Sequence, residues 1–426
     1  MATPLRSASS LPVVGAYFAS WRVLERGYFV KDIPAQHLNT LYYAFAEPRQ
    51  NGTVGLAHPD TDYRHRFEAH QSVTGRADVP DQPLAGNFNQ LMALRAANPH
   101  LRLVLGIGGW AESRYYSVAA ATPDSRRAFV DSCIDQFIRG NLNDPGLPGK
   151  GGGAIRGLFD GIDLDWEYPT TDPGNGAAHS PEDRDNLNLL AADLRAALDL
   201  EGAESGRHLV LTAAIPGGSK AGVYCDLPEL GRILDWINVM CYDYHGTQDD
   251  YAAFCSPFLA DPADPASGDP ALGTSGTIEY FIRAGVPPEK LCVGVPFYGN
   301  QYDVAVGEFG LYQAARKSST ELEPATFHGL VDELKILSGE DYSTAGGGLE
   351  RHWSDAVAEP FLWGRGLRAL GEPGPADRGV FVCYEDPTSI RQRARLVRQR
   401  NLGGVFAWEI SQDSDDHALT RAMSEG

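Results

Sequence analysis

The sequence predicts a (β/α)8 TIM barrel, a closed barrel of parallel strands surrounded by helices, with a small α+β domain inserted after the seventh strand. The first supporting observation is a series of short apolar runs that recur along the chain. Runs that are apolar throughout are typical of parallel barrel strands, because such strands are buried on both faces. The expected strands are 11–18, 41–46, 101–110, 157–165, 208–216, 236–242, 291–299 and 403–410.

The second observation is a set of amphipathic segments that separate several of these runs. A strand followed by a helix, repeated about eight times over ~250 residues or more, is the pattern of a (β/α)8 barrel. A doubly wound open sheet is the alternative, because the alternation of strands and helices does not show whether the sheet closes. The clearest expected helices are 87–98, 126–140, 183–198 and 387–401.

One interval, from Asn300 to about Arg378, departs from this rhythm. It is long and rich in glycine, has no clear strand–helix unit, and ends at the strand-like segment "GVFVCY", residues 379–384. We interpret it as an inserted α+β domain. The expected organisation is an N-terminal tail over 1–12, a barrel over 13–299 and 379–426, and an insertion over 300–378.

The composition excludes several classes of protein. With 426 residues, of which 43% are hydrophobic and 22% charged, the chain has the composition of an ordinary globular protein. Its formal net charge of -20 argues against a nucleic-acid or anionic-membrane partner. No apolar run approaches the ~20 residues of a membrane span. The first residues lack the apolar segment of a signal peptide, so we expect a protein that stays inside the cell or has lost its signal.

The cysteines are scattered without CxxC spacing, which argues against a metal site. Cys241 and Cys292 lie in apolar strand-like runs, where buried, reduced thiols are expected. The spacing leaves a disulfide between Cys225 and Cys255 open.

The most unusual segment is "GLFDGIDLDWEYP", residues 157–169. Apolar and acidic residues alternate in it, so Asp163, Asp165 and Glu167 should share one face of a strand. Asp160 has the other parity and is expected to be structural unless a bulge intervenes. The alternative without a function is a solvated strand whose acidic side chains point outward, but such a strand would favour Thr or Lys over repeated Asp.

In a barrel these three carboxylates would line the interior and rise toward the C-terminal mouth, where barrel enzymes hold their sites. Burial of several neighbouring carboxylates is costly unless they share protons. We therefore expect them to titrate as a set, with at least one raised pKa. A raised pKa is what a general acid requires.

"DGIDLDWE" resembles the DxxDxDxE signature of family 18 glycoside hydrolases, the chitinases. Other segments resemble landmarks of this family in the same order, from about Val13 to about Ser411. They are "GAYFASW", "LYYAFA", "GIGGW", "MCYDYHG", "GVPFYG" and "GGVFAWEI". The insertion is similar to the α+β domain of the deep-clefted subfamily.

The resemblance implies a catalytic role for each matching residue. Glu167 would protonate the leaving glycosidic oxygen, and Asp165 would bind both Glu167 and the acetamido nitrogen of the substrate. Asp163 would be the other station of a shared proton. Tyr242 would donate to the acetamido carbonyl oxygen, and Asp243 would contact the sugar at the bond that is cut.

Aromatic rings offer flat apolar faces for sugars, so Trp408, Trp110 and Tyr298 are candidate platforms. By the resemblance, Trp408 would lie beneath the distorted sugar and Trp110 would serve a sugar on the leaving side. The other tryptophans are expected in core or insertion packing. They are Trp21, Trp236, Trp353 and Trp363.

Three further residues complete the expected substrate-binding set. Tyr17 would donate a hydrogen bond to the Asp163 pair, Phe45 belongs to the YAF element and Met240 to the MxYD element. One position departs from the family pattern, because Gly106 stands where the family has Ser. The absence of the serine hydroxyl should remove one hydrogen bond to Asp163, and a water can substitute for it.

The resemblance implies hydrolysis of β-1,4-linked N-acetylglucosamine polymers with retention of configuration, by substrate-assisted catalysis without metal or organic cofactor. The expected protein is a secreted, extracellular monomer whose partner is chitin or a chito-oligosaccharide. An endo-β-N-acetylglucosaminidase acting on N-glycans is the alternative enzyme. A chitin-binding, lectin-like protein is the alternative outside enzymes, and the presence of Glu167 argues against it.

Overall fold

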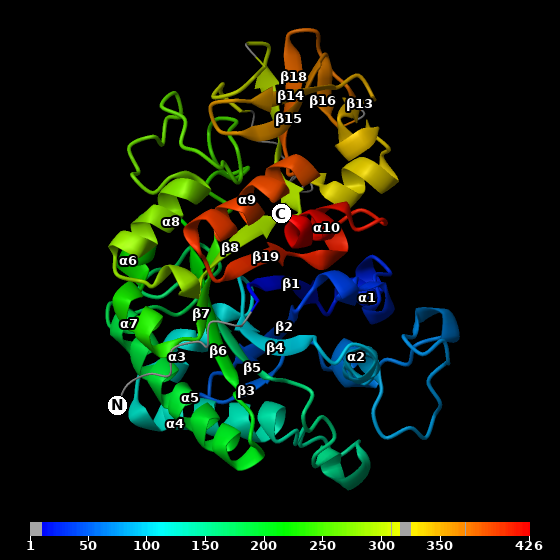
Figure 1. Ribbon diagram of the computed structural model, residues 1–426, viewed down its shortest axis with the longest axis vertical. Helices are drawn as coiled ribbons and strands as arrows, with labels where there is room; N and C mark the ends of the chain where they lie inside the picture. Colours follow the sequence, from blue (N-terminus) through cyan, green and yellow to red (C-terminus); the bar gives the residue numbers. More distant parts are fainter. Residues whose placement is uncertain (1–10, 308, 316–324, 371) are drawn as a thin grey trace.

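The computed structural model describes residues 11–426 except 308, 316–324 and 371. Within these residues, parallel strands follow one another in the order β1, β2, β4, β5, β6, β7, β8 and β19, and β19 pairs again with β1 (Figure 1). This closure confirms the predicted (β/α)8 barrel and excludes the open sheet. The expected tail over 1–12 lies almost wholly outside the described residues. The barrel strands are β1 (Val13–Ala19), β2 (Thr40–Pro48), β4 (Arg102–Gly108), β5 (Gly161–Asp165), β6 (Val210–Pro216), β7 (Trp236–Met240), β8 (Leu291–Pro296) and β19 (Gly404–Trp408).

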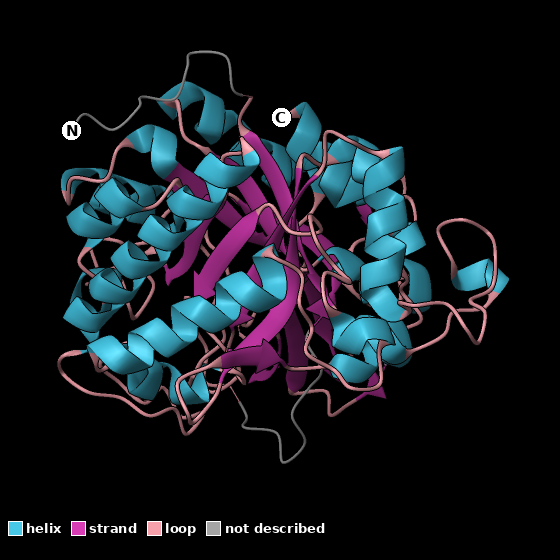
Figure 2. Cartoon of the chain, turned by 90° about the horizontal axis from the view of Figure 1, so that it is seen from below, coloured by secondary structure: helices cyan, strands magenta, loops and turns pink. Residues whose placement is uncertain are grey.

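Helices lie around the outside of the strands (Figure 2). Polar residues followed by proline begin two of them. Thr122 accepts the N–H of Ser125, and the carboxylate of Asp386 accepts the N–H groups of Thr388 and Ser389. The longer helices are α2 (Gly86–Ala97), α4 (Pro123–Cys133), α5 (Asp183–Ser205), α8 (Gly273–Arg283) and α9 (Pro387–Arg400). The shorter ones are α1 (Arg22–Glu25), α3 (Tyr116–Ala120), α6 (Ala221–Tyr224), α7 (Leu227–Ile233) and α10 (Ala418–Glu425). None of the described helices has both the length and the apolar character that a membrane span requires.

The strand alternation divides the core into two layers. Ile162, Leu164 and Trp166 belong to the layer between the strands and the helices. Tyr17 and Phe406 belong to a second layer inside the barrel. The indole ring of Trp166 stacks on Tyr116, with the ring centroids 5.0 Å apart. The outward packing of the apolar residues of β5 therefore turns the acidic residues between them into the barrel.

Between β8 and β19 the chain forms small antiparallel sheets that lie at the top of Figure 1. The largest sheet has the order β10 (Gln301–Ala305), β18 (Arg378–Cys383), β15 (Glu359–Arg365) and β14 (Glu350–Ser354). Three strand pairs accompany it: β9 (Tyr298–Gly299) with β11 (Ala325–Thr326), β12 (Leu337–Ser338) with β13 (Thr344–Ala345), and β16 (Leu367–Ala369) with β17 (Glu372–Pro373). A short strand, β3 (Val54–Leu56), extends the barrel sheet by antiparallel pairing with β2. These sheets agree with an α+β insertion after the seventh barrel strand, β8.

The strand β18 marks a difference from the sequence-based organisation. The segment 379–384 was assigned to the barrel, whereas β18 pairs antiparallel with β10 and β15 in the inserted sheet. Its residues Val380, Phe381 and Val382 are fully buried, like those of a barrel strand. An apolar run of this kind does not reveal which sheet it joins. The expected domain boundary at residue 378 therefore runs through the inserted sheet.

Candidate active site

The acidic residues of β5 lie inside the barrel. Asp163 is fully buried and Asp165 is 4% exposed. Glu167 follows the strand and is half-buried at its carboxyl end, where the other strands also end. Asp160 lies outside this series, because its carboxylate accepts the N–H of Leu103 at 2.9 Å and forms an ion pair with Arg95. The three carboxylates thus form one line from the interior to the mouth of the barrel.

Asp163 is surrounded by donors from three other strands. Its carboxylate accepts the hydroxyl of Tyr17 at 2.6 Å, the hydroxyl of Thr212 at 2.5 Å and the amide of Asn238 at 3.1 Å. Burial raises the pKa of Asp163 to about 6, and these hydrogen bonds act in the opposite direction. The residue can therefore exchange a proton near neutral pH.

Asp165 lacks comparable partners. Among the described residues, no group forms a hydrogen bond with its buried Oδ1 atom. Burial raises the pKa of Asp165 well above its usual value, and the charges of Glu167 and Asp163 raise it further. A buried polar atom without a partner is unusual in a folded protein. The atom is thus available to a proton or a ligand.

Glu167 is held by its backbone. The hydroxyl of Ser113, in the short helix η5 (Ser113–Tyr115), accepts the N–H of Glu167 at 2.9 Å and donates to the carbonyl of Asp165 at 3.1 Å. Asn175 donates to the carbonyl of Glu167 at 3.1 Å. Burial raises the pKa of Glu167 to about 7, and a hydrogen bond from Tyr168 opposes this rise. The carboxyl group is therefore protonated through much of the weakly acidic range.

The glycines of "GIGGW" let β4 pass close to β5. Gly108 has φ of 105°, and a Cβ atom there would lie 2.0 Å from the carbonyl oxygen of Asp165. Gly109 has φ of 89° and donates its N–H to the same carbonyl at 2.8 Å. Positive φ and close backbone approach both require glycine at these positions.

Gly106 pairs in register with Asp163, but no space is left beside it for a side chain. A Cβ atom there would lie 2.9 Å from the ring of Phe45 and 3.2 Å from the carbonyl oxygen of Tyr43. The ring of Phe45 occupies the region that a serine side chain would enter. Asp163 has its three donors without a hydroxyl at position 106.

Tyr242 and Asp243 lie just beyond the end of β7, after Cys241. Burial and the charges of Asp165, Asp243 and Glu167 raise the pKa of Tyr242 well above its usual value, so that its hydroxyl stays protonated. Asp243 has a positive φ of 55° and reaches the solvent. Its Oδ1 atom accepts the hydroxyl of Tyr298 at 2.7 Å and the thiol of Cys255 at 3.4 Å. Desolvation by the surrounding protein raises the pKa of Asp243 above its usual value, and the two hydrogen bonds only partly oppose this rise.

The expected aromatic platforms differ in their exposure. Trp110 is 51% exposed, whereas Trp408 and Tyr298 are half-buried. Trp408 stacks on Phe45 with the ring centroids 5.7 Å apart and an angle of 14° between the planes. Phe45 is 2% exposed and Met240 is 8% exposed, so both offer little surface to a ligand. Phe45 instead supports the ring of Trp408.

The other tryptophans lie in three environments. Trp236 is 1% exposed inside the barrel, where its indole N–H donates to the hydroxyl of Tyr42 at 2.8 Å. Trp363 is 8% exposed in β15, and Trp353 is half-buried in β14. Trp21 is also half-buried and lies beside Phe45 and His58, with ring centroids 6.3 Å and 5.1 Å away. Its neighbour Phe45 stacks on Trp408, so Trp21 belongs to the aromatic group around the barrel mouth.

Sequence reasoning did not identify several residues that contact the acidic residues of the site, either at the carboxylate or at the backbone. Thr212 and Asn238 are polar residues inside apolar strands, and this signal could have marked them as inward-facing partners. Ser113, Asn175 and Cys255 lie outside the barrel strands, where no periodic pattern indicates a direction. Their contacts follow only from the three-dimensional fold.

All six cysteines lie among the described residues, all six are buried, and none of them forms a disulfide. No disulfide therefore joins Cys225 and Cys255 in the structure. Cys241 and Cys292 are fully buried, as their apolar runs predict. Cys255 instead contacts Asp243.

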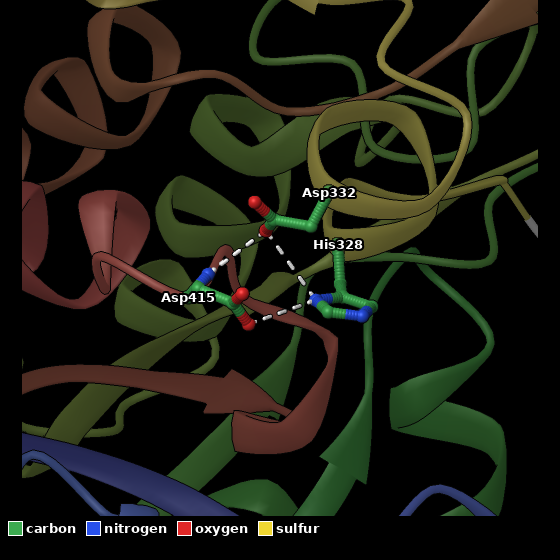
Figure 3. Close-up of side chains that lie close together, drawn as sticks. All are labelled: His328, Asp332 and Asp415. Carbon is green, nitrogen blue, oxygen red and sulfur yellow. Dashed lines mark hydrogen bonds and ion pairs between the residues drawn. The ribbon is translucent and has the colours of Figure 1, made fainter.

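A separate cluster joins the insertion to the segment after β19 (Figure 3). Nδ1 of His328 lies 3.4 Å from Asp332 and 3.6 Å from Asp415, and the backbone N–H of Asp415 donates to Asp332 at 2.9 Å. Potential ligand atoms of these three residues lie within 4.8 Å of one another. Asp415 is 81% exposed on its side chain, and every contact is that of an ion pair or hydrogen bond. We assign no metal to this cluster.

Comparisons with known proteins agree with this geometry. Residues 13–413 match the family model of glycosyl hydrolases family 18. The chain is 31% identical to chitinase A1 of Niallia circulans, over 96% of this chain and 57% of that protein. It is 29% identical to chitinase 1 of Aphanocladium album, over 96% of this chain and 85% of that protein. The chain spans 57% to 60% of the length of the first bacterial relatives that it matches.

Solved structures show the same fold. The catalytic domain of psychrophilic chitinase B from Arthrobacter TAD20 is 30% identical, with a TM-score of 0.78 over 96% of this chain and 94% of that one. Chitinase ChiA74 from Bacillus thuringiensis is 28% identical, with a TM-score of 0.77 over 98% of this chain and 70% of that one. The match to the family model over nearly the whole chain, together with the line of carboxylates on β5, shows that the chain belongs to glycosyl hydrolases family 18.

Proposed function

We propose that this protein is a chitinase that hydrolyses β-1,4 linkages between N-acetylglucosamine units with retention of configuration. One observation carries the proposal: buried carboxylates with raised pKa values lead along β5 to Glu167 at the barrel mouth. The similarity to chitinases over most of the chain supports the substrate class.

Glu167 is the general acid. Its pKa of about 7 keeps the carboxyl group protonated at weakly acidic pH, so that it can give a proton to the leaving glycosidic oxygen. The backbone of Glu167 is fixed by its N–H, which donates to the hydroxyl of Ser113, and by its carbonyl, which accepts from Asn175. Asp165 and Asp163 lie behind it and receive or share protons as the charge on Glu167 changes.

The nucleophile is the 2-acetamido oxygen of the substrate. Asp163 and Asp165 lie on the strand that leads to Glu167, so neither reaches the opposite face of the sugar. Substrate-assisted catalysis is the known exception that this family represents among glycosidases. The acetamido oxygen forms a bond to the anomeric carbon while the glycosidic C–O bond breaks and the leaving oxygen takes the Glu167 proton. Water then attacks the anomeric carbon, giving its proton to Glu167 and restoring the acetamido group.

The neighbouring side chains suit this intermediate. The free Oδ1 of Asp165 accepts the acetamido N–H and stabilises the positive charge that develops on the nitrogen. The protonated hydroxyl of Tyr242 donates to the acetamido oxygen and aligns it for attack. Asp243 binds the sugar at the bond that is cut, and Trp408 lies beneath its ring.

The proposed place of action is outside the cell, because an insoluble polymer does not enter the cytoplasm. A product time course on chitin and on a series of chito-oligosaccharides tests the activity, with Glu167→Gln as the inactive control. We expect β-configured products first and turnover about 10²–10⁴-fold lower in the control. Release of intact N-glycans from a glycoprotein, without cleavage of chito-oligosaccharides, would instead identify an endo-β-N-acetylglucosaminidase. Binding of chito-oligosaccharides without turnover would identify a lectin.

A further inference from the structure

Asp243 is held by two donors that reach the same oxygen atom. The hydroxyl of Tyr298 lies 2.7 Å from Oδ1, and the thiol sulfur of Cys255 lies 3.4 Å from it. The backbone of Asp243 has a positive φ of 55°, which is uncommon for a residue other than glycine. Two donors on one oxygen fix the rotation of the carboxylate, so the direction of the second oxygen is also determined.

The thiol of Cys255 acts as a donor. The residue is 2% exposed, and burial together with the charge of Asp243 raises the pKa of the thiol well above its usual value. The sulfur therefore keeps its proton and can donate it to the carboxylate of Asp243. A thiol is a weak donor to a neutral acceptor, but a charged acceptor strengthens the bond.

The backbone of Cys255 is in turn hydrogen-bonded to the insertion. Its backbone N–H donates to the sulfur of Cys383 at 3.4 Å, and its carbonyl accepts the N–H of Tyr244 at 3.0 Å. The sulfur of Cys383 also accepts the N–H of Asn300 at 3.3 Å. Cys383 ends β18 and Asn300 follows β9, so the sulfur joins the two points where the chain enters and leaves the inserted sheets.

We propose that Cys255 is a positioning residue: its thiol, together with the Tyr298 hydroxyl, orients the carboxylate of Asp243 toward the bound sugar and couples it to the base of the insertion. The catalytic part of this inference rests on the proposed function, which places Asp243 against the substrate. The Cys255–Asp243 contact itself is independent of any activity.

The contact has a consequence for pH dependence. The titratable groups that face Asp243 are the donors Cys255 and Tyr298, its neighbour Tyr242, and Glu167 and Tyr168 after β5. Loss of the thiol removes a bond to the charged form of Asp243, so its pKa rises. The acidic limb of the pH–rate profile should therefore move to higher pH in Cys255→Ala, by about half a pH unit.

Infrared spectroscopy tests the contact without any substrate. The S–H stretching band of Cys255 is isolated as the difference between the parent protein and Cys255→Ala. We expect this band to move to higher frequency in Asp243→Ala, because the thiol loses its acceptor. An unchanged band in Asp243→Ala would overturn the proposal. Circular dichroism of each variant verifies that it is folded.

Kinetics test the positioning role. On a chito-oligosaccharide, Cys255→Ala should shift the acidic limb and lower kcat more than it raises KM, and Cys255→Ser should restore much of both. Cys133→Ala, which removes a fully buried thiol from α4, is the matched control and should leave the pH profile unchanged. A profile of Cys255→Ala that superimposes on the parent profile would refute the role in positioning. If the parent protein itself cleaves no chito-oligosaccharide, the proposed function fails, whereas the infrared result still decides the contact.

Discussion

Gly106 and Phe45 lie so close together on neighbouring strands that a Cβ atom on Gly106 would be 2.9 Å from the Phe45 ring. The family pattern has a serine at this position. Its replacement by glycine predicts that Asp163 lacks one hydrogen bond. The structure shows a different compensation. Phe45 fills the space, and donors from β1, β6 and β7 serve the carboxylate.

Gly106→Ser should therefore lower stability without changing the pH–rate profile. Forcing a side chain into a filled core typically costs about 1–3 kcal/mol. Denaturant unfolding measures this cost, and Gly106→Ala serves as the steric control without a hydroxyl. A profile that shifts in Gly106→Ser but not in Gly106→Ala would show that the added hydroxyl reaches Asp163 after all.

Asp163→Asn should remove activity but increase stability at neutral pH relative to the parent. Burial raises the pKa of Asp163 in the folded protein to about 6, from an ordinary value of 3.8. The folded protein thus holds this proton more tightly than the unfolded chain, and stability falls as pH rises from about 4 to about 6. Asn carries no charge and avoids this loss, which amounts to at most about 3 kcal/mol above pH 6.

Unfolding in denaturant at pH values from 4 to 8 measures the difference between the two proteins. It should grow between pH 4 and 6 and then stay constant. Asp160→Asn is the control on the same segment, and it should destabilise the protein because Asp160 forms ion pairs with Arg95 and Arg207. A D163N variant that is less stable than the parent at pH 8 would contradict the argument.

Ser113→Ala should lower kcat and affect KM little. The Ser113 hydroxyl bridges the backbone on both sides of Trp166. Its loss should leave the backbone of Glu167, and with it the carboxyl group, less firmly positioned. A displacement of about 1 Å in a reacting group can cost about 10²-fold in rate. Ser117→Ala is a matched control, because Ser117 bonds to Asp183 of α5 instead. Equal kcat values for the two variants would argue against a positioning role for Ser113.

The site divides into parts that the sequence could predict and parts that it could not. Alternation along β5 predicts the inward direction of Asp163 and Asp165, because outward packing of the residues between them determines it. The same reasoning misplaced residues 379–384, since an apolar strand is compatible with either sheet. The contact of Cys255 with Asp243 joins two loop residues, and the clash at Gly106 depends on the rotamer of Phe45. Both are tertiary relationships that no periodic pattern contains.

Trp408→Ala and Trp110→Ala should have different effects. Trp408 stacks on Phe45 and is expected beneath the sugar that is distorted, so its loss should lower kcat on short and long substrates alike. Trp110 is 51% exposed and has no comparable support, so its loss should weaken binding of polymeric chitin more than that of short oligomers. Steady-state kinetics on a disaccharide glycoside and on polymeric chitin separate the two. Identical behaviour of the variants on both substrates would remove the assignment to distinct subsites.

Cello-oligosaccharides should not be cleaved, because they lack the acetamido group that is the proposed nucleophile. An ordinary retaining glycosidase places a second carboxylate about 5–5.5 Å from the acid, across the glycosidic bond. In this protein Asp163 and Asp165 belong to the strand that leads to Glu167, and Oδ1 of Asp243 is already occupied by Tyr298 and Cys255. Oδ1 of Asp165, in contrast, is buried without a partner and suits an acetamido N–H.

A thiazoline that mimics the cyclised intermediate tests the same step through binding instead of turnover. Its ring nitrogen takes the place of the charged nitrogen of the intermediate and can be protonated beside Asp165, so it should inhibit competitively and bind much more weakly to Asp165→Ala than to the parent. Isothermal titration measures both affinities, and Ser117→Ala again serves as the control. Hydrolysis of a cello-oligosaccharide at a rate near that of the matching chito-oligosaccharide would falsify the mechanism. The enzyme would then need a carboxylate nucleophile, and Asp243 would have to leave its two donors to provide one.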